Sequence, residues 1–151
     1  MLDTKAPMID LLNQDGQVFN IAQITSRYIL LYFYPKDMTP GCTAQACDLQ
    51  ASWDTLQSYD CSVIGVSKDS PARHRKFIDK YELPFPLLCD PEGKLCQAYD
   101  VWVQKSMFGK SYMGIERSSF LINSQREICQ IWRRVKPAAH INLVLDYLSS
   151  H

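Results

Sequence analysis

The sequence predicts an α/β fold in which helices pack against one central β-sheet. Continuous apolar runs at residues 28–34 and 62–67 have the composition of strands that are buried on both faces. A helical pattern follows each run, and a strand pair and a closing helix end the chain. This order, a β-α-β-α-β unit followed by a hairpin and a helix, is that of an α/β sandwich.

The N-terminal half alternates strands and helices. Asp15-Gly16 predicts the turn of an N-terminal β-hairpin. Behind strand 28–34, apolar residues recur every three or four positions and mark one face of a helix: Ala46, Leu49, Trp53 and Leu56. After strand 62–67, Ser70-Pro71 provides a cap and a first-turn proline for a second helix, which extends to Tyr81.

The C-terminal half contributes shorter elements. Residues 87–89 predict a short strand, and residues 95–99 predict a short helix. Strands 118–122 and 128–132 flank a polar turn and predict a β-hairpin. The last helix shows its buried face at positions i, i+3, i+4 and i+7: Ile141, Val144, Leu145 and Leu148.

Residues 101–114 show neither the helical nor the strand pattern of apolar residues, and we expect a long polar and aromatic loop there. Loops of this length often carry function. Four large side chains make the segment apolar, and they either line the rim of a substrate pocket or cover the core: Trp102, Met107, Phe108 and Tyr112.

Composition and charge narrow the function. The chain has 151 residues, 46% hydrophobic and 21% charged, which predicts one globular domain over residues 1–151. Its 16 basic and 16 acidic residues cancel, so we expect neither nucleic acid nor an anionic membrane as a partner. No apolar run approaches the roughly 18 residues that cross a bilayer, and no signal peptide is visible. We therefore expect a cytoplasmic protein.

Cysteine usage points to thiol chemistry. A cytoplasmic chain rarely holds structural disulfides. The cysteines lack the C-x-x-C and H-x-x-x-H pairs of zinc sites, so we expect no metal and no cofactor. The sequence contains six of them: Cys42, Cys47, Cys61, Cys89, Cys96 and Cys129.

The first cysteine is predicted to lie where a helix begins. Thr39 is placed as the N-cap, and Pro40 as the first helical residue, where its missing N–H costs nothing. Cys42 then falls in the first turn, among unpaired amides at the positive end of the helix dipole. Thiols at such positions ionise readily. The alternative is that Cys42 is a small apolar residue at the start of a helix.

The second cysteine, Cys47, lies five residues further along the same predicted helix. Helix geometry separates the two Cα atoms by roughly 8.6 Å. A disulfide needs less than about 7 Å. A Cys42–Cys47 disulfide therefore requires the first turns to unwind, which would make the pair a redox switch. The alternative is that Cys47 is a buried helix thiol.

Five segments resemble the peroxiredoxins, in particular their Q or bacterioferritin comigratory protein subfamily: YFYPKDMTPGCTAQACDL, GVSKDSPARHRKFIDKY, LPFPLLCDPEGKLCQAYDV, YMGIERSSFLI and the closing IWRRVKP-x2-H. The resemblance extends over nearly the whole chain. It implies a thioredoxin-like fold with a central mixed sheet flanked by helices. It also implies thiol-dependent reduction of hydrogen peroxide and organic hydroperoxides, recycling by thioredoxin or a similar thiol reductant, and a monomer.

The resemblance implies roles for five residues. Cys42 matches the peroxidatic cysteine and Cys47 the resolving cysteine. Thr39 matches the hydroxyl residue that binds thiolate and peroxide, and Pro35 matches the proline that shields the site from water. Arg117 matches the active-site arginine; its alternative is a surface salt bridge with the neighbouring Glu116. The chain departs from the family pattern at one position of this helix: it has Gln45 where many peroxiredoxins have Glu.

We also assign expected roles to the remaining cysteines and to two of the histidines. We expect packing roles for Cys61 and Cys129, a partly buried structural His74, and a surface His140. Cys89 and Cys96 are the alternative candidates for the resolving thiol. Two other functions stay open: a general disulfide reductase, which normally uses C-x-x-C, and a non-enzymatic thiol redox sensor.

Overall fold

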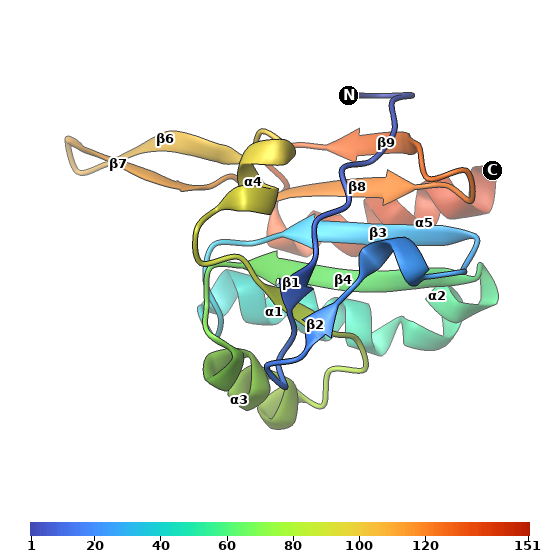
Figure 1. The fold of residues 1–151 in the computed structure, drawn as a ribbon, viewed down its shortest axis with the longest axis horizontal. Coiled ribbons are helices and arrows are strands. Elements are labelled where there is room, and N and C mark those ends of the chain that lie inside the picture. The colour runs from blue at the N-terminus through green and yellow to red at the C-terminus, as the bar shows by residue number, and fades with distance from the viewer.

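The computed structural model describes residues 1–151 and contains two β-sheets with helices around the larger one (Figure 1). The larger sheet has seven strands in the order β2-β1-β5-β4-β3-β8-β9. Its strands are β1 (Leu11–Leu12), β2 (Val18–Phe19), β3 (Tyr28–Phe33), β4 (Cys61–Ser67), β5 (Leu87–Cys89), β8 (Ser118–Ile122) and β9 (Ile128–Trp132). The helices are η1 (Ile21–Gln23), α1 (Pro40–Ala51), α2 (Trp53–Ser58), α3 (Pro71–Tyr81), α4 (Lys94–Ala98), η2 (Pro137–Ala139) and α5 (His140–Ser150).

The larger sheet is mixed, which confirms the predicted fold class. β3, β4 and β5 pair in parallel through the crossover helices, while β8 lies antiparallel to β3, and β9 to β8. β1 pairs antiparallel with both β2 and β5, so the predicted N-terminal hairpin is present and extends the sheet.

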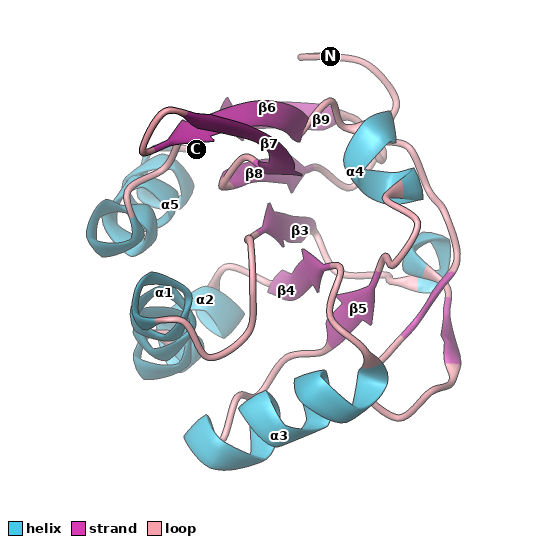
Figure 2. Cartoon of the chain, turned by 90° about the vertical axis from the view of Figure 1, so that its left-hand side faces the viewer, coloured by secondary structure: helices cyan, strands magenta, loops and turns pink.

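Two apolar cores lie on opposite faces of this sheet. Alternate residues of β3 belong to different cores, as the pleat requires: Leu30 and Tyr32 face one core, and Leu31 and Phe33 the other. The first core packs against α1, α2, α3 and α5, and the second contains residues of η1 and α4. Figure 2 shows the four longer helices on one side of the sheet and α4 on the other. β3 is therefore buried on both faces, as its sequence predicts.

Gly65 in β4 makes room for a tyrosine beneath α1. It pairs with Tyr32 of β3, and a Cβ built on Gly65 would lie 2.6 Å from Leu87 Cδ2 and 3.0 Å from Tyr32 Cζ. No side chain fits at such distances unless its neighbours move. Because Gly65 has no Cβ, the Tyr32 ring can lie over β4 at this position.

Two predictions about the elements were wrong. The single helix predicted to begin at Pro40 and to carry its apolar face through Leu56 is two helices, α1 and α2, divided at Ser52. Residues 102–115 are not a loop but a separate antiparallel hairpin, β6 (Trp102–Met107) and β7 (Lys110–Ile115), which projects from the body in Figure 1. Its turn residues Phe108 and Gly109 have φ of 54° and 78°, the left-handed pair that a two-residue hairpin turn requires.

The large side chains of this hairpin have different environments. Trp102 packs against the second core, whereas Met107, Phe108 and Tyr112 are exposed, Phe108 almost completely at 97%. Trp102 therefore covers the core, which was one of the two predicted alternatives. Met107, Phe108 and Tyr112 are not part of either core and do not cover one. No helix of the structure is long and apolar enough to cross a membrane.

Candidate active site

The site forms where β3 passes into α1. A short loop leaves β3, Thr39 takes the N-cap position, and Pro40 is the first residue of the helix, as predicted. Cys42 is the third helical residue and is only 2% exposed. The Thr39 side chain makes no capping hydrogen bond, because its hydroxyl donates instead to the Lys36 carbonyl at 2.9 Å.

Arg117 reaches Cys42 from the segment between β7 and β8. Its Nη2 donates to Cys42 Sγ at 3.3 Å, and its Nη1 donates to Gln45 Oε1 at 2.6 Å. The alternative pairing of Arg117 with Glu116 is wrong, since Glu116 instead faces Arg133 and Arg134 at 3.5 and 3.6 Å. The sulfur of Cys42 is therefore in direct contact with a positively charged group.

Gly41 lies next to Arg117 and Pro137 at the start of α1. A Cβ built on Gly41 would lie 3.4 Å from Arg117 Nη2 and 3.1 Å from the ring of Pro137, in η2. The distance to Pro137 is tight, so a side chain at position 41 would require Pro137 to shift by a few tenths of an ångström, whereas the distance to Arg117 is that of an ordinary van der Waals contact. Pro137 was not predicted as a neighbour of the site, because η2 and the start of α1 are far apart in the sequence.

Gln45 replaces the expected carboxylate with a neutral amide. Its side chain is buried, its oxygen accepts from Arg117, and its Nε2 has no hydrogen-bond partner. A glutamate here would offset the charge of Arg117, and the amide leaves that charge directed at the sulfur. Arg117 is thus held by an acceptor that does not neutralise it.

No hydrogen bond joins the other predicted site residues to the sulfur. Pro35 is exposed, and no hydrogen bond joins Thr39 to Cys42. Cys47 is a free, half-buried thiol in α1, and burial together with the neighbouring Asp48 raises its pKa. Because α1 is continuous from Pro40 to Ala51, Cys42 and Cys47 cannot bond in this conformation.

The four remaining cysteines are also free. Cys61 and Cys89 are buried, and Cys129 is half-buried against the first core. Cys96 belongs to the second core, across the sheet from Cys42. This placement argues against Cys96 as the resolving thiol.

His140 is buried, contrary to the expectation of a surface residue. A 2.7 Å hydrogen bond joins its Nε2 to Ser119 Oγ, and its Nδ1 has no partner. Burial and the nearby Arg117 charge lower the pKa of His140 to about 4, so the ring is neutral at pH 7. A sequence signal existed: His140, Val144 and Leu148 are four residues apart and share the buried face of α5.

We expect His140 to destabilise the protein in acid. Its pKa is about 4 in the folded protein and about 6.5 when unfolded, so its contribution is present above pH 6.5 and is lost as pH falls through 4. The full loss is up to about 3 kcal/mol. Urea unfolding of wild type and His140→Gln at pH 7 and pH 4.5 measures it: the variant should lose less stability than wild type. Equal losses would show that His140 does not contribute.

The fold and the Cys42–Arg117 pair define a thioredoxin-fold protein with an arginine-paired thiol at the start of a helix. The AhpC/TSA family profile matches residues 2–131. Peroxiredoxin Bcp of Bacillus subtilis is 48% identical over 95% of this chain and 92% of its own, and that of Escherichia coli K12 is 40% identical over 97% and 94%. The structure of Xanthomonas campestris peroxiredoxin Q superposes with a TM-score of 0.88, at 38% identity over 95% of this chain and 90% of that chain.

A second Xanthomonas campestris structure is equally similar. It is described as giving insight into the alkyl peroxide reduction activity of the bacterioferritin comigratory protein, and it superposes with a TM-score of 0.88 at 37% identity, over 95% and 91% of the two chains. The chain belongs to the AhpC/TSA family and, within it, to the Bcp or Q group of peroxiredoxins. It is a thiol-dependent peroxidase, which uses a peroxide as substrate and a thiol as reductant.

Proposed function

We propose that Cys42 is the peroxidatic thiol and Cys47 the resolving thiol in the reduction of hydrogen peroxide and organic hydroperoxides. The observation that carries the proposal is the 3.3 Å contact between Arg117 Nη2 and Cys42 Sγ in the first turn of α1. The alkyl peroxide reduction attributed to the Xanthomonas relative supports the substrate class.

The first step is an attack by the Cys42 thiolate on the terminal peroxide oxygen. An S–O bond forms, the O–O bond breaks, and the leaving oxygen takes a proton to become water or an alcohol. Cys42 becomes a sulfenic acid, with sulfur oxidised by two electrons. Arg117 and the unpaired amides of the first turn stabilise the negative charge that moves onto the leaving oxygen.

Thr39 and Pro35 are proposed to complete the site around the substrate. The Thr39 hydroxyl already donates to Lys36, so its lone pairs remain available to accept from a peroxide O–H. Pro35 is exposed in the free protein, so its proposed shielding of the site from water would apply once a peroxide is bound.

The second step links the two cysteines. Cys47 attacks the Cys42 sulfenic sulfur, an S–S bond forms, and the hydroxyl leaves as water. The first turns of α1 must unwind to bring the sulfurs together, because the continuous helix keeps them apart. Two thiols of the reductant then restore both cysteines by disulfide exchange.

We expect one equivalent of peroxide to link Cys42 to Cys47. Peptide mass spectrometry of the oxidised protein should find the linked pair as the main product. Cys47→Ser, oxidised in the absence of any other thiol, should form no linked pair and leave Cys42 as sulfenic or sulfinic acid. Cys129→Ser is the matched control and should keep the linked pair. A link from Cys42 to Cys89 or Cys96 would instead reassign the resolving thiol.

The reductant is proposed to be thioredoxin or a similar dithiol protein, and the working form a monomer in the cytoplasm. All six cysteines are free, which suits a reducing compartment. Turnover with thioredoxin and its reductase would support an enzyme. Slow oxidation of one equivalent without turnover would instead indicate the non-enzymatic redox sensor.

A further inference from the structure

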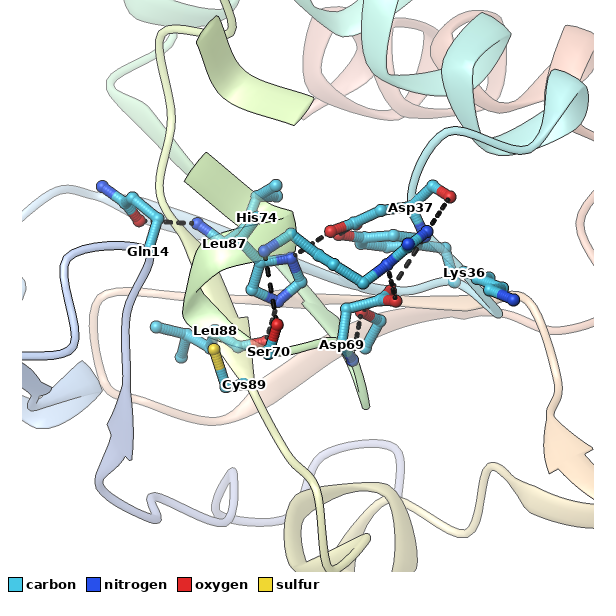
Figure 3. Close-up of polar contacts among 12 residues, drawn as sticks. Gln14, Lys36, Asp37, Asp69, Ser70, His74, Leu87, Leu88 and Cys89 are labelled. Atoms are coloured by element: carbon cyan, nitrogen blue, oxygen red, sulfur yellow. Dashed lines mark hydrogen bonds and ion pairs between the residues drawn. The ribbon is translucent and has the colours of Figure 1, made fainter. Parts of the chain in front are cut away.

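The loop between β3 and α1 is anchored at a buried aspartate. Asp37 is 1% exposed and lies two residues before the N-cap Thr39. Its Oδ1 accepts from the Tyr34 hydroxyl at 2.5 Å, and its Oδ2 lies 2.6 Å from His74 Nδ1 (Figure 3). The carboxylate therefore has a partner on each oxygen.

His74 comes from α3 and is completely buried, more deeply than expected from the sequence. Its Nε2 lies 2.9 Å from the Leu88 carbonyl in β5, which can only accept a hydrogen bond, so Nε2 carries a proton. Its Nδ1 faces the Asp37 carboxylate. With an acceptor at each nitrogen, the ring is held as an imidazolium, and the pair is a buried ion pair.

The backbone of Asp37 is fixed by the same region of the fold. Its N–H donates to Asp69 Oδ2 at 2.8 Å, and its carbonyl accepts from Arg73 Nη2 at 3.3 Å. Asp69 is itself held by the Ser67 hydroxyl at 2.7 Å and by Arg73 Nε at 3.1 Å. Both the side chain and the backbone of Asp37 are thus tied to β4, α3 and the segment between them.

The anchor lies immediately before the segment that must move. Met38, the next residue, has a left-handed φ of 65°, which a non-glycine residue adopts only when its surroundings impose it. Thr39, Pro40 and Cys42 follow. If α1 unwinds and re-forms in every cycle, a fixed point before Met38 limits the disorder gained and returns Cys42 to Arg117.

We propose that Asp37 and His74 are a positioning pair that fixes the start of the peroxidatic segment, so that Cys42 re-forms its contact with Arg117. Neither residue contacts the reacting atoms. The inference rests on the proposed role of Cys42, and it adds that a buried ion pair on another helix sets the geometry of that thiol.

The first test measures oxidation of Cys42 in a single turnover. Rapid mixing with hydrogen peroxide, followed by thiol labelling, gives the rate constant for wild type, Asp37→Asn, His74→Gln and the double variant. We expect each single variant to be at least about tenfold slower, since small misplacements of reacting groups have large effects on rate. The double variant should be no more than about threefold slower than the slower single variant, because the two residues act as a unit.

The matched control is His151→Gln, the same substitution at an exposed histidine in the last position of the chain, which should react like wild type. Thermal unfolding shows which variants are folded. Folded Asp37→Asn and His74→Gln proteins that react within threefold of wild type would overturn the inference and leave the proposed function intact. A wild-type protein that forms no Cys42 sulfenic acid would overturn both.

The second test uses pH and needs no variant of Asp37 or His74. Burial lowers the pKa of His74, but the hydrogen bond and charge of Asp37, together with Cys89, outweigh it and raise the pKa from 6.5 to about 9. The titratable and charged groups around His74 are Asp37 and Cys89, with Tyr34 behind Asp37. Asp69, which has a carboxylate oxygen within 4.8 Å of an Asp37 carboxylate oxygen and of a His74 ring nitrogen, is paired with Arg73. The ion pair between Asp37 and His74 is therefore fully formed below pH 6.5 and is lost as pH rises through 9.

We expect the rate of Cys42 oxidation to fall as pH rises through 9. Thiolate formation can only increase the rate with pH. Burial and Arg117 also lower the pKa of Lys105, so Lys105→Gln is compared with wild type, and a fall that persists in this variant identifies loss of the Asp37–His74 pair. Cys89→Ser should keep the fall, which excludes titration of Cys89 as its cause. A wild-type rate that stays level or rises up to pH 10 would overturn the inference, even where the His74 variants do not fold.

Discussion

Cys42→Ser is expected to reduce peroxide consumption to the uncatalysed background, a loss of at least about a thousandfold. The nucleophile is the thiolate, and a serine hydroxyl in the same first turn stays protonated at neutral pH. Arg117 would then face a neutral oxygen where it now contacts Sγ at 3.3 Å. Peroxide consumption with dithiothreitol or thioredoxin as reductant measures the effect.

Cys42→Ser tests the role of the thiol without a large change in side-chain size. Serine is nearly isosteric with cysteine, and Cys42 makes one side-chain hydrogen bond, so thermal unfolding should change little. Cys129→Ser, at a half-buried cysteine in β9, provides the same chemical change away from the site and should keep full activity. A Cys42→Ser protein with more than about 1% of wild-type activity would show that another thiol performs the first step.

Local patterns predicted the local structure well. The apolar run at residues 28–34 is the buried strand β3, and Ser70 caps α3 by accepting from the Arg73 N–H, as the Ser-Pro pair indicates. The hairpin of β6 and β7 was missed because its strands, whose residues are mostly exposed or half-buried, mix polar and apolar side chains, so neither alternation nor a continuous apolar run marks them. Its one clear signal was Gly109 in the turn.

Contacts between distant residues were the limit of the sequence reading. Arg117 and Cys42 are 75 positions apart, and only the family resemblance brought them together before the structure. The Asp37–His74 pair, 37 positions apart, had no such help and was not foreseen. His74 was placed on the right helix face, but its charge depends on an aspartate in another element, which periodicity cannot reveal.

Arg117→Ala is expected to reduce the rate of Cys42 oxidation by more than tenfold, and by up to about 10²–10³-fold, without unfolding the protein. Ionisation alone cannot account for catalysis. For any cysteine, a pKa lowered from about 8.5 to about 6 raises the thiolate fraction at pH 7 about thirtyfold. The weaker nucleophilicity of that thiolate removes about tenfold, which leaves only about threefold. Donors directed at the breaking O–O bond must supply the rest.

Arg117→Lys separates charge from geometry. Lysine keeps the positive charge but lacks the two-pronged guanidinium that now binds Gln45 Oε1 and Cys42 Sγ together, so its rate should lie between those of wild type and Arg117→Ala. Arg134→Ala, which removes an exposed arginine paired with Glu116, is the matched control and should react like wild type. Stopped-flow oxidation rates for Arg117→Ala within threefold of wild type would refute the role of Arg117. In that case the unpaired amides at the start of α1 would have to provide the stabilisation by themselves.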